Sequence, residues 1–213
     1  MIGPEVRDGD AGLWHRAGSM FTVIELDQGT PEWRAWRREG IGASDAPSIM
    51  GECPWKSANY LLRQKSSPDT EPRQNAAMAR GTRLEPEARR SYVTVTGREV
   101  NPACLQSIQY PWLRASVDGI CFNNQILVEI KCGDSVYRQT AKERRVPRYY
   151  YGQLQHQLAV TGFDAVDFWC YLPGRPELLL SVPRDEPYIE RMLCTELEFW
   201  GRVQQGLAAQ ATP

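Results

Sequence analysis

Histidine and paired cysteine are scarce in this sequence, and their scarcity excludes the usual transition-metal sites. The chain has only two histidines, His15 and His156, and its six cysteines are scattered without a CxxC pair. Zinc and iron–sulfur sites require such ligands at short, regular spacings. Because no secretory pattern accompanies the cysteines, we expect reduced thiols in a cytoplasmic protein.

Long apolar runs and a strong excess of one charge are also absent. No run approaches the roughly 20 apolar residues that span a bilayer, and the N-terminus lacks the layout of a signal peptide. We therefore expect no membrane anchor. The formal net charge of −1 argues against a simple wrap-around nucleic-acid binder but leaves room for a local basic groove. Basic residues gather over 34–38, 80–90 and 138–148, where each group alone is typical of a solvated helix face.

The size and composition that remain are those of one globular domain. The chain has 213 residues, of which 42% are hydrophobic and 24% are charged. We expect a lead-in over residues 1–22, a single domain over 23–205 and a flexible tail over 206–213.

The hydrophobic pattern predicts helices first, then a β-meander, a crossover helix, two strands and a closing helix. Expected helices cover residues 30–38, 44–51, 57–64, 74–96, 148–160 and 187–205. Expected strands cover residues 100–105, 107–116, 119–122, 126–131, 165–172 and 178–182. Residues 66–73 read as a loop and 133–147 as a mobile basic connection. This order predicts an α/β fold, with a mixed central β-sheet flanked by helices.

The strand over 126–131 carries a pattern with chemical meaning. Side chains alternate along a strand, so Glu129 and Lys131 share one face while Val128 and Ile130 face the other, which suits the core. An isolated Glu-x-Lys is common and is more often a surface pair. We expect neighbouring cations to lower the pKa of Lys131.

Asp118 lies upstream, just before Gly119 at the predicted end of a strand. A tight turn through residues 123–124 brings it beside Glu129. Two carboxylates and an amine on a buried face are costly unless something compensates them. Mg²⁺ prefers carboxylate oxygens and retains waters, so these residues favour a magnesium site that activates water. The alternative is an aspartate at a turn beside a surface ion pair.

Two further positions are candidates on helices. Glu85 precedes Pro86, which predicts a kink or a new helix start, and it reads either as a positioned carboxylate or as a surface glutamate. Gln153 and Gln157 share a helix face, and an amide can hold a water or contact a phosphate. We assign Gln157 to an ordinary polar face and His156 to a structural role.

The segment from Arg37 to Ser44 has the features of an anion site. An arginine is followed by a loop with two glycines and a serine that can cap a helix. Loop amides, a hydroxyl and a helix N-terminus all favour phosphate, and arginine adds a forked donor. Simple N-capping by Ser44 is compatible with the same residues.

Taken together, these segments resemble the YqaJ-type viral recombinases, the family that includes phage lambda exonuclease, within the PD-(D/E)XK nuclease superfamily. The resemblance runs from about Trp33 to Leu172 and rests on five short segments in order. These are residues 37–44 (RREGIGAS), 81–85 (GTRLE), 116–119 (SVDG), 128–132 (VEIKC) and 151–155 (YGQLQ). Val117 stands where the superfamily name expects proline, a departure that does not touch the chemistry.

The resemblance implies an Mg²⁺-dependent exonuclease, with Mn²⁺ as a substitute, that degrades one strand of linear double-stranded DNA from a 5′-phosphate end. It implies a ring-shaped homotrimer, a single-strand annealing protein as partner, and a phage or prophage protein in the cytoplasm of a bacterial host. Its implied roles are metal binding by Asp118, Glu129, Glu85 and the main chain of Ile130, catalysis by Lys131, water positioning by Gln153, and 5′-phosphate binding by Arg37 and Ser44.

Two alternatives remain open at this stage. One is an endonuclease of the same superfamily, although the short chain offers no separate recognition domain. The other is a non-catalytic clamp that binds DNA ends and recruits an annealing protein. Intact Asp118, Glu129 and Lys131 argue against the clamp.

Overall fold

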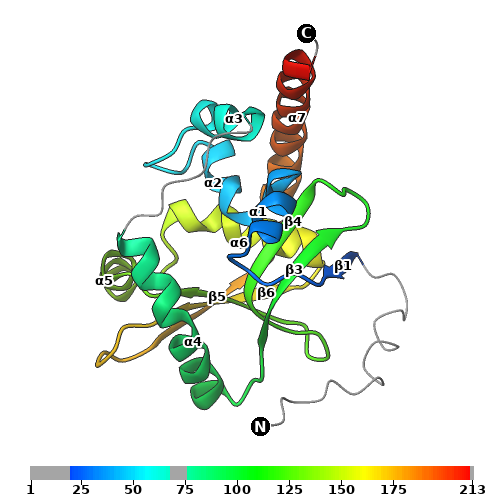
Figure 1. Ribbon diagram of the computed structural model, residues 1–213. Helices are drawn as coiled ribbons and strands as arrows, with labels where there is room; N and C mark the ends of the chain where they lie inside the picture. Colours follow the sequence, from blue (N-terminus) through cyan, green and yellow to red (C-terminus); the bar gives the residue numbers. More distant parts are fainter. Residues whose placement is uncertain (1–19, 68–75, 212–213) are drawn as a thin grey trace.

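A seven-stranded mixed sheet forms the centre of the protein. The computed structural model describes residues 20–67 and 76–211. The strand order is β1-β3-β4-β5-β6-β7, with β2 beside β4. The β2–β4 and β5–β6 pairs are parallel and the others are antiparallel. The strands are β1 (Phe21–Ile24), β2 (Ile41–Gly42), β3 (Asn101–Ser107), β4 (Leu113–Cys121), β5 (Ile126–Lys131), β6 (Ala165–Cys170) and β7 (Leu178–Pro183). The expected α/β fold with a mixed sheet is confirmed (Figure 1).

Helices surround this sheet. They are α1 (Pro31–Arg38), the 3-10 turn η1 (Ala43–Asp45), α2 (Ala46–Ile49), α3 (Ala58–Ser66), α4 (Ala76–Thr96), α5 (Asp134–Glu143), α6 (Arg148–Thr161) and α7 (Glu186–Ala211). Thr30 caps α1 by accepting the Trp33 N–H, and Pro31 occupies the first turn, as the sequence predicts. Helix α4 runs through Pro86 without a new start. In the described part of the chain, no helix is long and apolar enough to cross a bilayer.

Helices α4 and α6 cover opposite faces of the sheet. Phe168 packs in the core that contains Leu154 and Leu158 of α6. Its neighbour Trp169 packs in the core that contains Tyr92 of α4. Adjacent side chains of a strand point to opposite faces, so each face has its own core. Helix α7 packs against α3 through a third core and extends away from the sheet (Figure 1).

The connection between β5 and α6 is ordered as a helix, so the expected mobile stretch over 133–147 is wrong. Val136, Tyr137 and Thr140 are buried along α5. Their spacing places them on one helix face, which anchors α5 against the sheet. The charged residues around them occupy the solvent side, and their number masked this apolar face in the sequence.

Asp118 lies inside β4, and the expected strand break at Asp118-Gly119 is wrong. The break between β3 and β4 comes earlier, between Ser107 and Leu113. Gly119 has a packing role instead of a turn role. A Cβ at that position would lie 2.8 Å from Cγ2 of Val100, which is too close for a side chain.

The ends of the domain also differ from expectation. Strand β1 begins at Phe21 and pairs with β3, although residues up to 22 read as a lead-in. Helix α7 continues to Ala211, beyond the expected end at residue 205. Residues 1–19 of the lead-in, the last two residues of the tail and residues 68–73 of the expected loop lie outside the described residues. The domain boundaries themselves stay a prediction.

Candidate active site

The site begins where β4 and β5 separate. Their ladder runs from Cys121 opposite Ile126 to Gly119 opposite Val128. Beyond it, the Ile130 N–H donates to Oδ2 of Asp118 at 2.7 Å, so a carboxylate takes the place of a strand partner. The N–H and C=O of one strand residue point to the same edge, and the Ile130 carbonyl therefore also faces β4. Asp118 and Glu129 lie beside one another as the sequence predicts.

Glu129 is the most enclosed carboxylate of the site, with 2% of its surface exposed. Its Oε1 accepts hydrogen bonds from Lys131 Nζ at 2.5 Å and Gln153 Nε2 at 2.6 Å. Its Oε2 accepts one from Gln157 Nε2 at 2.5 Å. These contacts satisfy a buried carboxylate that would otherwise be costly. They also connect β5 to α6, since both glutamines lie on that helix.

Gln157 is a site residue that the sequence interpretation missed. The assignment to an ordinary polar helix face is wrong, because Gln157 is completely buried and contacts Glu129. The signal was present: Gln153 and Gln157 are four residues apart and share a helix face. Burial of that face against β5 is a tertiary feature, which the spacing alone does not reveal.

Lys131 lies among anions and an aromatic ring. Its Nζ is 3.4 Å from Oε1 of Gln153 and 4.5 Å from the centre of the Tyr150 ring. Burial alone lowers the pKa of Lys131, but Glu129, Tyr150 and Asp118 together raise it above its usual value. The expected lowering of this pKa is wrong, because the nearest charged groups are carboxylates. Lys131 is therefore a protonated donor in this structure.

Glu85 reaches the site from α4 through Arg89. The Arg89 guanidinium pairs with Glu85 one helical turn away, and its Nε donates to the Asp118 carbonyl at 2.6 Å. Burial raises the pKa of Glu85, Arg89 opposes this rise, and Glu129 adds to it. The sequence placed Arg89 only among solvated basic residues, so its contact with β4 is a finding of the structure. We call Glu85, Asp118, Glu129, Lys131, Gln153, Gln157 and Arg89 the acidic cluster.

The acidic cluster contains three carboxyl groups and two cationic side chains, Lys131 and Arg89. Burial raises the pKa of Asp118 well above its usual value, and the nearby Glu129 and Glu85 raise it further. Lys131 and Arg89 already contact Glu129 and Glu85. No three histidine, cysteine or acidic side chains of the described residues are gathered as a ready metal site. A donor set of two half-buried or buried carboxylates suits Mg²⁺, which binds proteins through one or two carboxylates and keeps its waters.

Arg37 and Ser44 form a second polar group, between α1 and η1. Arg37 donates to Oγ of Ser44 at 2.7 Å, and its guanidinium lies 4.7 Å from the centre of the Trp33 ring. Ser44 lies within η1 and is exposed, so the expected role as a helix N-cap is wrong. A Cβ on Gly42 would lie 3.2 Å from an Arg37 nitrogen, so the guanidinium packs directly over this glycine.

The Arg37–Ser44 turn rests on a buried ion pair. Asp45 accepts the Gly42 N–H at 3.2 Å and contacts Lys65 Nζ at 2.9 Å. Lys65 also donates to the Gly40 carbonyl at 2.7 Å. Burial by itself raises the pKa of Asp45, but Lys65, Lys56 and Arg37 hold it well below its usual range. The shape of this turn is therefore set by charges beneath it.

Helix α6 links the two groups. Gln153 of the acidic cluster follows Gly152, where a Cβ would lie 3.3 Å from the Pro47 nitrogen of α2. The missing side chain of Gly152 therefore lets α6 lie close to the segment that follows the Arg37–Ser44 turn. The structure thus gathers Asp118, Glu129, Lys131 and Gln153 at one point, brings Glu85 to them through Arg89, and keeps Arg37 and Ser44 as a separate pair.

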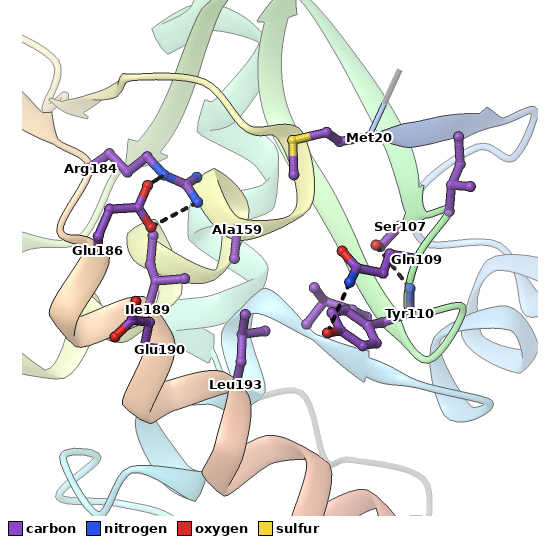
Figure 2. A pocket seen from close by; sticks show the side chains of 12 residues that line it. Met20, Ser107, Gln109, Tyr110, Ala159, Arg184, Glu186, Ile189, Glu190 and Leu193 are labelled. Atoms are coloured by element: carbon purple, nitrogen blue, oxygen red, sulfur yellow. Dashed lines mark hydrogen bonds and ion pairs between the residues drawn. The ribbon is translucent and has the colours of Figure 1, made fainter. Parts of the chain in front are cut away.

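A pocket of about 430 Å³ lies elsewhere on the molecule. Figure 2 shows Arg184 and Glu186 at one side of it and Tyr110 at the other. None of the predicted site residues lines this pocket. The acidic cluster therefore lies apart from this concavity.

Comparison with known proteins identifies the family. The model of the YqaJ-like viral recombinase domain matches residues 32–164, which contain every residue of the acidic cluster and the Arg37–Ser44 turn. The chain belongs to the YqaJ-like viral recombinase family. The resemblance read from the sequence is thus confirmed.

Two curated proteins are similar to this YqaJ-like chain. The uncharacterized protein YqaJ of Bacillus subtilis is 29% identical over 175 residues, covering 79% of this chain and 54% of that protein. Protein D345L of African swine fever virus is 28% identical over 177 residues, covering 67% of this chain and 50% of that protein. The chain spans about half the length of these relatives.

Solved structures with the same fold are exonucleases. The alkaline exonuclease LHK-Exo from Laribacter hongkongensis superposes with a TM-score of 0.76 at 27% identity, covering 85% of this chain and 96% of that one. A phage-related exonuclease from Haemophilus somnus shares the fold, with a TM-score of 0.62 at 12% identity, covering 81% of this chain and 96% of that one. The YqaJ-like chain therefore has the fold of PD-(D/E)XK-type exonucleases.

Proposed function

We propose that this protein is an Mg²⁺-dependent exonuclease that degrades one strand of linear double-stranded DNA from the 5′ end. The product would be a 3′ single strand available for annealing-type recombination. One observation carries the proposal. Asp118 accepts a hydrogen bond from the main chain of β5 beside Glu129 and Lys131, in a chain with the fold of an alkaline exonuclease.

The metal would be held by Asp118, Glu129 and the carbonyl of Ile130, with Glu85 in support. Burial raises the pKa of Asp118, repulsion from Glu129 and Glu85 raises it further, and a divalent cation would relieve this repulsion. When bound, Mg²⁺ supplies an acidified water and stabilises charge on phosphoryl oxygens. We expect Mn²⁺ to substitute, because it also prefers oxygen ligands.

The chain's own residues would orient the reacting groups. Lys131, held protonated by Glu129, would donate to a phosphoryl oxygen as negative charge develops there. Gln153, whose amide contacts both Glu129 and Lys131, would position the attacking water. Gln157 and Arg89 would act as positioning residues, since they hold Glu129 and the Asp118 main chain.

The direction of degradation would come from the Arg37–Ser44 turn. The Arg37 guanidinium and the Ser44 hydroxyl are donors suited to a terminal 5′-phosphate. Helix α2 has only four residues, so the guanidinium and the hydroxyl, and not a long helix N-terminus, would provide the affinity. The similar exonuclease LHK-Exo was also solved in complex with dAMP, a deoxynucleoside monophosphate of the kind that an exonuclease would release.

The assembly would be a ring-shaped homotrimer that threads DNA, and the partner would be a single-strand annealing protein. Both belong to the proposal as consequences of the family resemblance. So does a phage or prophage origin, with action in the cytoplasm of the host. The mass of the purified protein in solution tests the trimer directly.

One assay tests activity, polarity and end recognition together. Linear duplexes labelled separately at the 5′ and 3′ ends, with and without a 5′-phosphate, are incubated with Mg²⁺. We expect early release of the 5′ label, faster degradation of phosphorylated ends, and no attack on closed circles. Release of the 3′ label first contradicts the direction. Cleavage of closed circles favours an endonuclease, and end binding without nucleotide release in Mg²⁺ or Mn²⁺ favours a clamp.

A further inference from the structure

Trp55 is the most exposed of the large hydrophobic side chains reported for the described residues, with 72% of its surface accessible. It does not stand alone. The rings of Trp55 and Tyr149 pack edge to face, with ring centres 4.7 Å apart and planes at 75°. The Tyr149 hydroxyl donates to Oε1 of Gln139 at 2.8 Å, which fixes that ring from α5. Trp55 therefore presents a supported aromatic surface to solvent.

The aromatic contacts lead from Trp55 to the acidic cluster. Tyr149 lies against Tyr150, with ring centres 4.7 Å apart. Tyr150 in turn lies 4.5 Å from Lys131 Nζ. Two tyrosine rings thus separate Trp55 from the amine that would contact the scissile phosphate.

The next residue connects the same segment to the Arg37–Ser44 turn. Lys56 Nζ is 3.4 Å from Oδ1 of Asp45, the carboxylate that accepts the Gly42 N–H. Contacts therefore connect the Trp55–Lys56 segment both to the carboxylate beneath the Arg37–Ser44 turn and, through two tyrosine rings, to Lys131. Arg148, which precedes Tyr149, has 84% of its side chain exposed and pairs with Glu52 at 3.5 Å.

A nucleotide whose two phosphates are bound at these groups also needs a surface that binds its base. An aromatic face binds any base by stacking, independently of sequence. A single exposed hydrophobic residue needs no explanation by itself. An exposed tryptophan backed by another ring, and linked by contacts to two groups suited to phosphates, has the composition of a single-strand binding surface.

We propose that Trp55, supported by Tyr149, is a stacking platform for the unpaired base of the 5′-terminal nucleotide. The ligand class is a nucleobase of single-stranded DNA. The platform would hold the end of one strand away from its complement while the first phosphodiester lies at the acidic cluster. This inference rests on the proposed function for the identity of the two phosphate positions.

The test measures binding without cleavage. Affinities are determined in EDTA for 5′-phosphorylated duplexes whose terminal nucleotide is unpaired and carries either a base or an abasic sugar. We expect wild-type protein to bind the abasic end about 5- to 150-fold more weakly, the range of base–aromatic stacking. Trp55→Ala would bind both ends with the lower affinity. Trp55→Phe would retain most of the discrimination, because a phenyl ring still stacks.

Tyr60→Ala is the matched control, since Tyr60 is an exposed aromatic residue with no described contact to either group. It should discriminate as wild type does. Three outcomes would overturn the proposal. Trp55→Ala could still distinguish the two ends as wild type does, wild type could bind both ends equally, or Trp55→Ala could change only the number of subunits. Because no divalent cation is present, absence of Mg²⁺-dependent degradation would count against the proposed function alone.

Discussion

Two buried charge groups of this protein use the same residue types and differ in their balance. Asp45 contacts Lys65 at 2.9 Å and Lys56 at 3.4 Å, and the pKa of its carboxyl lies well below the usual range. Burial raises the pKa of the Asp118 carboxyl well above the usual range, and Glu129 and Glu85 raise it further. A buried carboxylate paired with lysines, such as Asp45, stabilises the shape of the chain. A cluster with more carboxyl groups than cationic side chains is suited to binding a cation.

The largest effect should come from Asp118. We expect Asp118→Ala to reduce Mg²⁺-dependent degradation of linear duplex by at least about 1000-fold, because removal of a metal ligand takes away the charge stabilisation of the transition state. The fold should survive, since the substitution also relieves repulsion with Glu129 and Glu85. Nuclease assays and thermal unfolding measure the two quantities. Asp164→Ala, at an exposed site, is the control, and full activity of Asp118→Ala would refute the site assignment.

The opposite result is expected at Lys65, where stability should suffer. Lys65→Met leaves Asp45 as a buried charge with weakened compensation, so unfolding should become easier by about 3–5 kcal/mol. Urea unfolding measures this change. The double variant Asp45→Asn with Lys65→Met should recover part of the loss, because it removes both charges. A single variant as stable as wild type would show that the pair contributes nothing to the fold.

Mg²⁺ should stabilise the protein by binding at the acidic cluster and not at the Asp45–Lys65 pair. At a concentration of 100 times its dissociation constant, Mg²⁺ should stabilise the wild-type protein by about 2.7 kcal/mol. Thermal unfolding in Mg²⁺ and in EDTA would record an increase of roughly 5–10 °C for a chain of this size. Asp118→Asn should lose this increase, and Asp164→Asn should keep it. An unchanged increase in Asp118→Asn would remove Asp118 from the metal site.

The smallest expected effect is at the Arg37–Ser44 turn. Arg37→Ala should slow degradation of 5′-phosphorylated ends by about 10- to 100-fold, the range for loss of a hydrogen bond to a charged group. Ends with a 5′-hydroxyl should be affected much less. Arg34→Ala is the control, because Arg34 is exposed on the same helix. Equal slowing of both kinds of end would argue against a phosphate site here.

The parts of the site that follow strand and helix periodicity were predictable. Alternation along β5 predicts that Glu129 and Lys131 share a face, and the structure agrees. Helix α6 was predicted to within one residue, because its apolar pattern is continuous. The spacing of Gln153 and Gln157 also predicts a shared face. The burial of that face depends on contact with β5, where Glu129 lies 24 residues before Gln153 in the sequence.

The parts that depend on contacts between distant segments were not predictable. Neighbouring cations are expected to lower the pKa of Lys131, whereas the charged groups that surround it in space are the carboxylates of Glu129 and Asp118. Asp118-Gly119 looked like a turn, although Gly119 serves close packing against Val100. Arg89 has no sequence signal that separates it from other arginines of α4. Each case requires knowledge of which residues meet across the sheet.

The hydrogen bond from Ile130 to Asp118 makes one backbone proton a spectroscopic reporter. This amide is bonded to a side chain that would change partners when a cation arrives, while neighbouring amides of β5 remain in the ladder. Its nuclear magnetic resonance shift and its rate of exchange with deuterium should therefore respond to occupancy of the site. A single ¹⁵N-labelled isoleucine position can thus follow binding in solution without any turnover of DNA.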